Sequence, residues 1–104
     1  MPIAEVNRLI ELANYQEGAV VSRTHVNRAK GTVTLLAFDE GQCLSEHTAP
    51  YDALAHLLEG EAEIVISGKP LRGTAGEGVL MPAHQSHSLK ALSKFKMLLT
   101  MIHS

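Results

Sequence analysis

The chain has 104 residues, of which 45% are hydrophobic and 19% charged, with a formal net charge of −2 and no cluster of basic residues. This composition fits one globular domain and predicts no nucleic-acid partner. The lone Cys43 excludes a disulfide framework within the chain, and no apolar run is long enough for a membrane span, so we expect a cytoplasmic protein that does not bind membranes.

The first predicted element is a short amphipathic helix over Pro2–Asn14. Its apolar residues recur at helical spacing: Val6, Leu9, Ile10 and Ala13. Such a helix is marginal in water by itself, so its apolar side should pack on the rest of the domain or on a second copy of the chain. We therefore divide the chain into an N-terminal helix and lead-in over residues 1–18 and a main domain over residues 19–104.

The remainder of the chain predicts short β-strands separated by turns. Runs of β-branched or continuous apolar residues cover 19–26, 32–41, 53–58, 62–66, 79–82 and 94–102, whereas residues 39–50 are polar and rich in turn formers. About eight short strands at roughly ten-residue spacing, without a long helix, predict an all-β double-sheet barrel or jelly roll. The last run is nearly continuously apolar at its centre and should be buried on both faces.

The strongest indication of function comes from two blocks that contain turn-forming residues, Gly41–Gly60 and Gly76–Ala91. His47 ends an extended run in the first block, and His87 follows a short turn in the second. These histidines are forty residues apart in sequence. They can share one cavity only if the sheet closes on itself, which predicts a small barrel with both imidazoles at its mouth.

The two blocks resemble the paired motifs of the cupin superfamily. The first motif is Gly, five residues, His-x-His, three or four residues, Glu, six residues and Gly; the second is Gly, five residues, Pro-x-Gly, two residues, His, three residues and Asn. The positions in register with these motifs are Gly41, His47, Gly60, Gly76, Pro82 and His87. The chain departs from them at Ala49, Ala53, His84 and Ala91. The resemblance implies a cupin-type double-stranded β-helix, a jelly-roll barrel, which usually forms a homodimer.

In cupins a divalent metal is held by the two His and the Glu of the first motif and the His of the second. Only His47 and His87 carry over, as possible ligands of zinc, iron, manganese or nickel. A firm site needs at least three protein ligands. A possible third ligand is His84, and the further candidates are Glu46, Asp52 and His56.

Each candidate ligand also has a structural interpretation. The two motif histidines could be hydrogen-bonded polar groups at a pocket entrance. His84 could simply occupy a left-handed turn position, which His tolerates better than β-branched residues do. By strand alternation His56 should point away from the lumen, and Asp52 could cap the turn after Pro50.

Alanines at two expected ligand positions should make the lumen larger and more apolar, as suits a small organic ligand. We expect the pocket to be lined by Ala49, Tyr51, Ala53, Met81 and Met97. Tyr51 either orients the ligand or covers the barrel end, and the methionines could equally fill the core. Cys43 is either a nucleophile with His47 as its base or a small buried or half-buried side chain.

Together these features predict a small-molecule-binding cupin, acting as a metal-dependent oxygenase or isomerase on a small metabolite in the lumen. The alternative is a noncatalytic metabolite-sensing or accessory homodimer without metal. The homodimer is also supported by the apolar side of the predicted helix and by the last strand.

Overall fold

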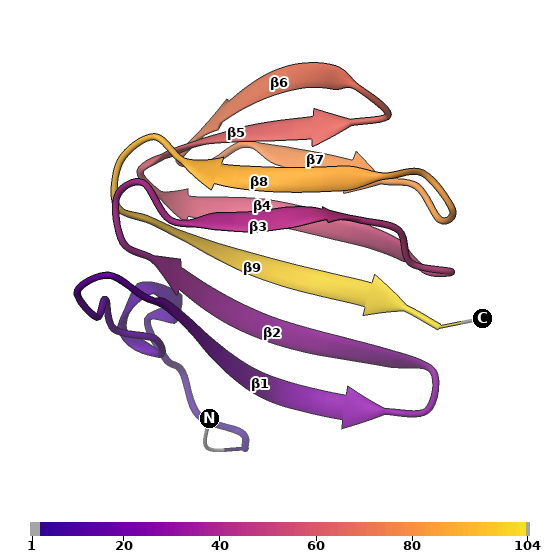
Figure 1. Cartoon of the computed structure of the whole chain (residues 1–104). Helices are drawn as coiled ribbons and strands as arrows, with labels where there is room; N and C mark the ends of the chain where they lie inside the picture. Colours follow the sequence, from indigo (N-terminus) through magenta and orange to yellow (C-terminus); the bar gives the residue numbers. More distant parts are fainter. Residues whose placement is uncertain (1–2, 104) are drawn as a thin grey trace.

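The computed structural model describes residues 3–103, which form two antiparallel sheets facing each other (Figure 1). The elements are η1 (Leu9–Glu11), β1 (Val20–Arg28), β2 (Gly31–Phe38), β3 (Cys43–His47), β4 (Asp52–Glu59), β5 (Glu61–Ile66), β6 (Lys69–Thr74), β7 (Gly78–Met81), β8 (His87–Ala91) and β9 (Phe95–Ile102). One sheet has the order β1-β2-β9-β4-β7 and the other β3-β8-β5-β6. From β2 onward the chain crosses repeatedly between the sheets, which confirms the predicted all-β jelly roll.

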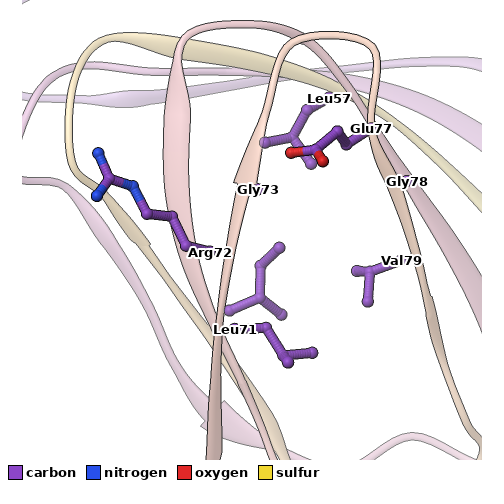
Figure 2. A pocket seen from close by; sticks show the side chains of 8 residues that line it. Leu57, Leu71, Arg72, Gly73, Glu77, Gly78 and Val79 are labelled. Carbon is purple, nitrogen blue, oxygen red and sulfur yellow. The ribbon is translucent and has the colours of Figure 1, made fainter.

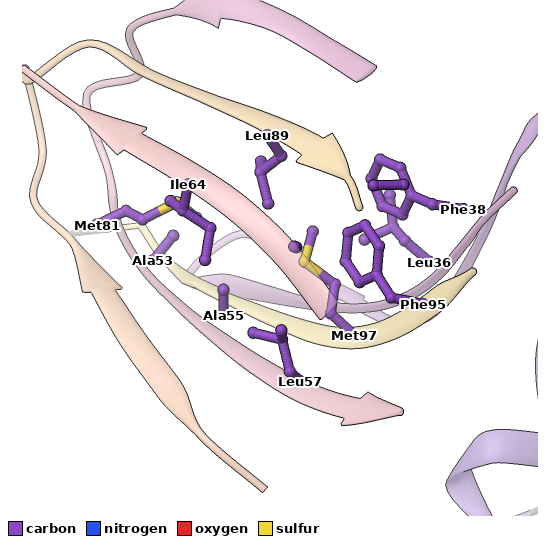
Figure 3. Packing of buried hydrophobic residues seen from close by; sticks show 12 residues of the cluster. Leu36, Phe38, Ala53, Ala55, Leu57, Ile64, Met81, Leu89, Phe95 and Met97 are labelled. Carbon is purple, nitrogen blue, oxygen red and sulfur yellow. The ribbon is translucent and has the colours of Figure 1, made fainter. Parts of the chain in front are cut away.

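The core fills the space between the two sheets (Figure 3). Residue alternation along β4 illustrates how the sequence builds it: Ala53, Ala55 and Leu57 are buried, while Leu54 and His56 point to solvent. At one end of this core the rings of Phe38 and Phe95 stack with centroids 4.3 Å apart. Met81 and Met97 are 2% and 0% exposed, so these thioethers do fill the core, as one of the two interpretations predicted.

The last strand is buried on both faces over its first residues, Phe95–Met97, whereas its last residue, Ile102, is 56% exposed, so the predicted burial holds for the first part of the strand. β9 lies in the centre of the five-stranded sheet, between β2 and β4. Met97 faces the inner core, whereas Leu98 packs with a second cluster on the outer face, around Leu35 and Ala37. Neighbouring strands and two packed faces together explain why this strand carries so few polar residues.

The N-terminal segment is helical only over the 3-10 turn η1, so the expected amphipathic helix over 2–14 was wrong in extent and type; Pro2 lies outside the described residues. Val6, one of its expected apolar contacts, is fully exposed. Ala13 is 3% exposed and packs on the outer face of the sheet. The Ile10 carbonyl accepts a hydrogen bond from the Lys96 ammonium instead of from a following helical turn. Tertiary contacts therefore outweigh the weak intrinsic helicity of a short segment.

Residues 39–50 contain the strand β3, which the polar sequence predicted as mainly turn. Only Leu44 of this strand packs against the core, and the other side chains are exposed. β3 is an edge strand that pairs with β8 alone. An edge strand with one inward apolar residue has almost no hydrophobic periodicity, so pattern analysis has little to detect. No helix within residues 3–103 has the length and hydrophobicity needed to cross a membrane.

Candidate functional site

One end of the barrel collects the ends of several strands from both sheets. β3 ends there, β8 starts there, and the chain leaves β9 toward the C-terminus at the same end (Figure 1). His47 and His87 are direct cross-strand partners in the β3–β8 pair. Their ring centroids lie 4.2 Å apart and the ring planes meet at 67°, in an edge-to-face arrangement. The fold thus brings together two side chains that are distant in sequence.

A bulge in β3 is what directs His47 to the inner face. Leu44 packs inward, so regular alternation would place Glu46 inward and His47 outward. The β3–β8 register shifts between Leu44 and His47, and this extra residue reverses the alternation. Both Glu46 and His47 are exposed, and of the two it is His47 that lies against His87.

Backbone hydrogen bonds determine which ring nitrogen of each imidazole carries a hydrogen atom. The Nδ1 atom of His47 lies 2.8 Å from the carbonyl oxygen of Ser45, and that of His87 lies 3.4 Å from the carbonyl of Gln85. A carbonyl only accepts, so each Nδ1 is the donor. In the neutral rings Nε2 then carries the lone pair and is free to accept a hydrogen bond, accept a proton or bind a metal.

His87 is the more buried member of this pair, at 8% exposure. Burial lowers the pKa of its imidazole below the usual 6.5, and the nearby His47 lowers that pKa further. His87 is therefore neutral at neutral pH. An imidazole in this state is a hydrogen-bond acceptor or a general base.

The facing sheet contributes a second pair of rings at this end. Tyr51 precedes β4 and His103 follows β9, and their rings stack with centroids 4.0 Å apart. The Nε2 atom of His103 is buried and has no hydrogen-bond partner within residues 3–103. Buried polar atoms normally have a partner, so this atom marks a place for a ligand group or water. The sequence analysis missed His103. This residue is an even number of positions from Met97 and Met101, which face inward, so strand alternation could have predicted its inward direction.

The other candidate ligands do not gather around the histidine pair. His84 is exposed with a φ of +65°, and its backbone N–H donates to the carbonyl of Ala49 at 2.8 Å. The left-handed turn conformation suggested for this residue is confirmed. Asp52 accepts a hydrogen bond from the Ala83 N–H at 2.8 Å, which ties the turn after β3 to the turn after β7. His56 points to solvent from the outer face of β4, as alternation predicts.

The donor set does not fit a resident metal in this conformation. Residues 3–103 contain no group of three His, Cys, Asp or Glu side chains placed to hold an ion. Zinc and the other expected transition metals use at least three protein ligands in firm sites. Two imidazoles are fewer than this requirement, so metal binding through His47, His87 and His84 stays a prediction.

The five predicted pocket residues lie on the inner side but differ in accessibility. Ala53, Met81 and Met97 are 6%, 2% and 0% exposed and belong to the core. Ala49 and Tyr51 are half-buried near the mouth. A ligand at this end would therefore contact mouth residues above a filled core, and the predicted pocket stays a prediction.

Cys43 lies at the other end of β3, paired with Lys90, and is exposed. It alternates with the inward Leu44 and so points away from the lumen. This placement corrects the interpretation of Cys43 as a small buried residue. It also gives the thiol no contact with the expected base, His47.

The chain matches the family described as Cupin domain over residues 34–103. This chain belongs to the cupin family. A conserved protein of unknown function from Streptococcus pyogenes is 33% identical, with a TM-score of 0.96 over 100% of this chain and 91% of that chain. A cupin superfamily protein from Desulfitobacterium hafniense is 25% identical, with a TM-score of 0.94 over 100% and 95%.

A conserved-barrel cupin from Leptotrichia buccalis is 36% identical, with a TM-score of 0.87 over 89% of this chain but 45% of that longer chain. A comparison with curated proteins gave no match. The cupin barrel expected from the two motifs is thus confirmed. The similar structures identify the fold and the family.

Proposed function

We propose that this cupin binds a small organic molecule at the barrel mouth, where the Nε2 atoms of His47 and His87 accept its polar hydrogen atoms. The observation that carries the proposal is the cross-strand imidazole pair, whose Nδ1 atoms are already held by carbonyl oxygens. Both rings are thereby oriented before a ligand arrives, which lowers the entropic cost of binding. A ligand with hydroxyl groups, which can donate to both Nε2 atoms, and a small apolar part fits these partners.

Tyr51 and His103 would form the opposite side of this site. Their stacked rings offer an apolar surface, and the buried Nε2 of His103 offers one further polar contact. The neutral His87 could also remove a proton from a bound ligand, which would make an isomerisation possible. Binding alone, in a metabolite-sensing or accessory protein, requires fewer groups and is the form of the function that the two-histidine site supports best.

A thermal-shift experiment tests this proposal with a panel of small hydroxylated metabolites. A ligand of the mouth should raise the melting temperature of the natural protein and of a His56→Ala control. The shift should vanish in the His47→Ala, His87→Ala double variant. If a metabolite stabilises all three proteins equally, it binds elsewhere and the proposed mouth site is wrong.

A metal-dependent oxygenase or isomerase is the second candidate, favoured by the two adjacent imidazole rings. Metal analysis of protein purified without an affinity tag separates the candidates. We expect less than one equivalent of zinc, iron, manganese or nickel, because the site has two imidazoles and no described third ligand. One equivalent that disappears in the His47→Ala, His87→Ala double variant would overturn the metal-free proposal.

We further propose that the protein acts as a cytoplasmic homodimer that pairs through the outer face of the five-stranded sheet. One row of residues crosses all five strands in register on this face: Val26, Val33, Thr100, Leu54 and Leu80. Three of them, Val26, Leu54 and Leu80, are 42%, 46% and 62% exposed. A row with several exposed apolar side chains is a feature of protein interfaces, and a second copy of the chain presents the same row under twofold symmetry.

A further inference from the structure

A pocket of about 200 Å³ opens on the side of the barrel, between the edge strands β6 and β7 (Figure 2). Its lining includes none of the residues predicted for the mouth. The walls include Leu57, Ile64, Leu71, Gly73 and Val79, with Glu77 at the rim, and Arg72 also borders the pocket. The mouth histidines lie where β3 ends and β8 starts, whereas Glu77 lies in the turn between β6 and β7 at the opposite end of the strands. This side pocket is therefore separate from the mouth site.

A glycine on the inner face borders the side pocket. Gly73 occupies an inward position of β6, between the half-buried Leu71 and the β6–β7 turn. The Leu57 side chain packs closely on this glycine, because a Cβ atom on Gly73 would lie only 3.1 Å from Cδ2 of Leu57. Leu57 and Ile64, each 1% exposed, form an apolar floor. Such a floor stabilises a ligand by removing apolar surface from water.

The negative charge of Glu77 at the rim favours a positively charged ligand. Glu77 uses one oxygen, Oε1, to accept hydrogen bonds from the backbone N–H and the hydroxyl of Thr74, both at 2.8 Å. These bonds hold the carboxylate over the pocket and lower its pKa, so Glu77 is charged at neutral pH. Its Oε2 has no hydrogen bond within the described chain and remains an acceptor.

The nearby arginine does not compete for this role. Arg72 alternates with the inward Leu71 and Gly73, and its guanidinium points away from the pocket in Figure 2. Its Nε donates to Oε2 of Glu61 at 2.9 Å, so its charge is already paired on the outer face. The side pocket thus presents one fixed negative charge above an apolar floor.

We propose that the side pocket binds a small organic ammonium ion, with its alkyl part on Leu57, Ile64 and Val79 and its cationic end on Oε2 of Glu77. The volume is below the roughly 300 Å³ at which sites for drug-sized ligands begin, so the ligand has only a few carbon atoms. A carboxylate of the same shape would be repelled by the Glu77 charge and should bind more weakly. Nothing in this site depends on the function proposed for the mouth.

An NMR titration of the full-length ¹⁵N-labelled protein tests this proposal with n-butylammonium and n-butyrate as matched probes. n-Butylammonium should cause saturable shifts of the Gly73, Gly78 and Val79 amide signals, and n-butyrate should bind at least about tenfold more weakly. Equal shifts with both probes, or no saturable shift at these amides, would overturn the proposal.

Three variants assign the contacts. Glu77→Gln removes the negative charge but keeps a side-chain oxygen that can accept the hydrogen bonds from Thr74. This variant should bind n-butylammonium about tenfold more weakly. Gly73→Ala should press Leu57 into the pocket and weaken binding independently of charge. Glu40→Gln, an exposed carboxylate in the β2–β3 turn, should bind like the natural protein. If Glu77→Gln fails to fold, the Gly73→Ala variant and the comparison of the two probes still test the proposal. Unchanged binding in a folded Glu77→Gln or Gly73→Ala protein would contradict the contact assigned to that residue.

Discussion

His47 and His87 meet edge-to-face across the β3–β8 pair, with ring centroids 4.2 Å apart. The inner position of His47 depends on the bulge after Leu44, and that of His87 on regular alternation with the buried Leu89. One irregularity in an edge strand therefore creates the pair. Ala49 and Ala53 stand at two other positions of the motif, so the described residues supply two imidazoles at this end of the barrel.

The stability of the protein should fall as the pH is lowered from about 8 to about 5. Burial lowers the pKa of His87 and also that of His25 in the folded state, whereas both titrate near 6.5 once unfolded. The unfolded chain then binds more protons below about pH 6.5, so the stabilisation is complete above that pH and is lost toward the folded pKa. Melting temperatures measured across this range should show the decrease.

The contribution of His87 to this pH dependence can be isolated with one variant and one control. His87→Asn removes a titrating group with a lowered pKa and should make the melting temperature fall less steeply with acid. His56→Asn, on the exposed outer face of β4, should retain the natural slope. An unchanged slope in His87→Asn would show that His87 is not a source of the acid sensitivity.

Two glycines of the cupin motif pattern should differ sharply in their tolerance of alanine. Both have left-handed backbone, with φ of +81° at Gly60 and +82° at Gly41. A Cβ on Gly60 would lie 2.0 Å from the carbonyl oxygen of Lys94, whereas one on Gly41 would have no neighbour within 4 Å. Gly41→Ala should therefore cost only the conformational penalty of about 1–2 kcal/mol, and Gly60→Ala more than about 4 kcal/mol.

Urea denaturation measures both losses as changes in the free energy of unfolding. The two variants share the same substitution and nearly the same φ, so Gly41→Ala is a control for backbone strain. Similar losses would mean that the β8–β9 turn moves away from Gly60 at little cost, which would contradict the close approach seen between Gly60 and Lys94.

The proposed dimer predicts a molar mass near twice the 11.2 kDa of the chain in light scattering. Leu80→Lys places a charge in the exposed row of the five-stranded sheet and should yield monomers, because burying an unpaired charge is costly. Leu92→Lys is the matched control, since Leu92 is 41% exposed in the turn between β8 and β9, outside this row. A natural protein of about 11 kDa in solution would contradict the dimer.

The sequence alone determined the cupin barrel and the principal residues of its mouth. Glycines, prolines and histidines at motif spacing identify the family, and alternation along β4 correctly separates the buried Ala53 from the exposed His56. These features are local, because turn residues and a period of two are visible in a single strand. The same analysis overestimated the N-terminal helix, since local propensity was weak there and contacts of Ile10 and Ala13 with the barrel prevailed.

Only the tertiary structure decided which of these residues meet. The bulge that turns His47 inward leaves no mark in the sequence, and the stacking of Tyr51 on His103 joins residues from distant strands. The side pocket likewise depends on two edge strands that come from different sheets. Register, bulges and sheet edges follow from the packing of the whole chain, so residues far apart in sequence acquire a common site only when the barrel closes.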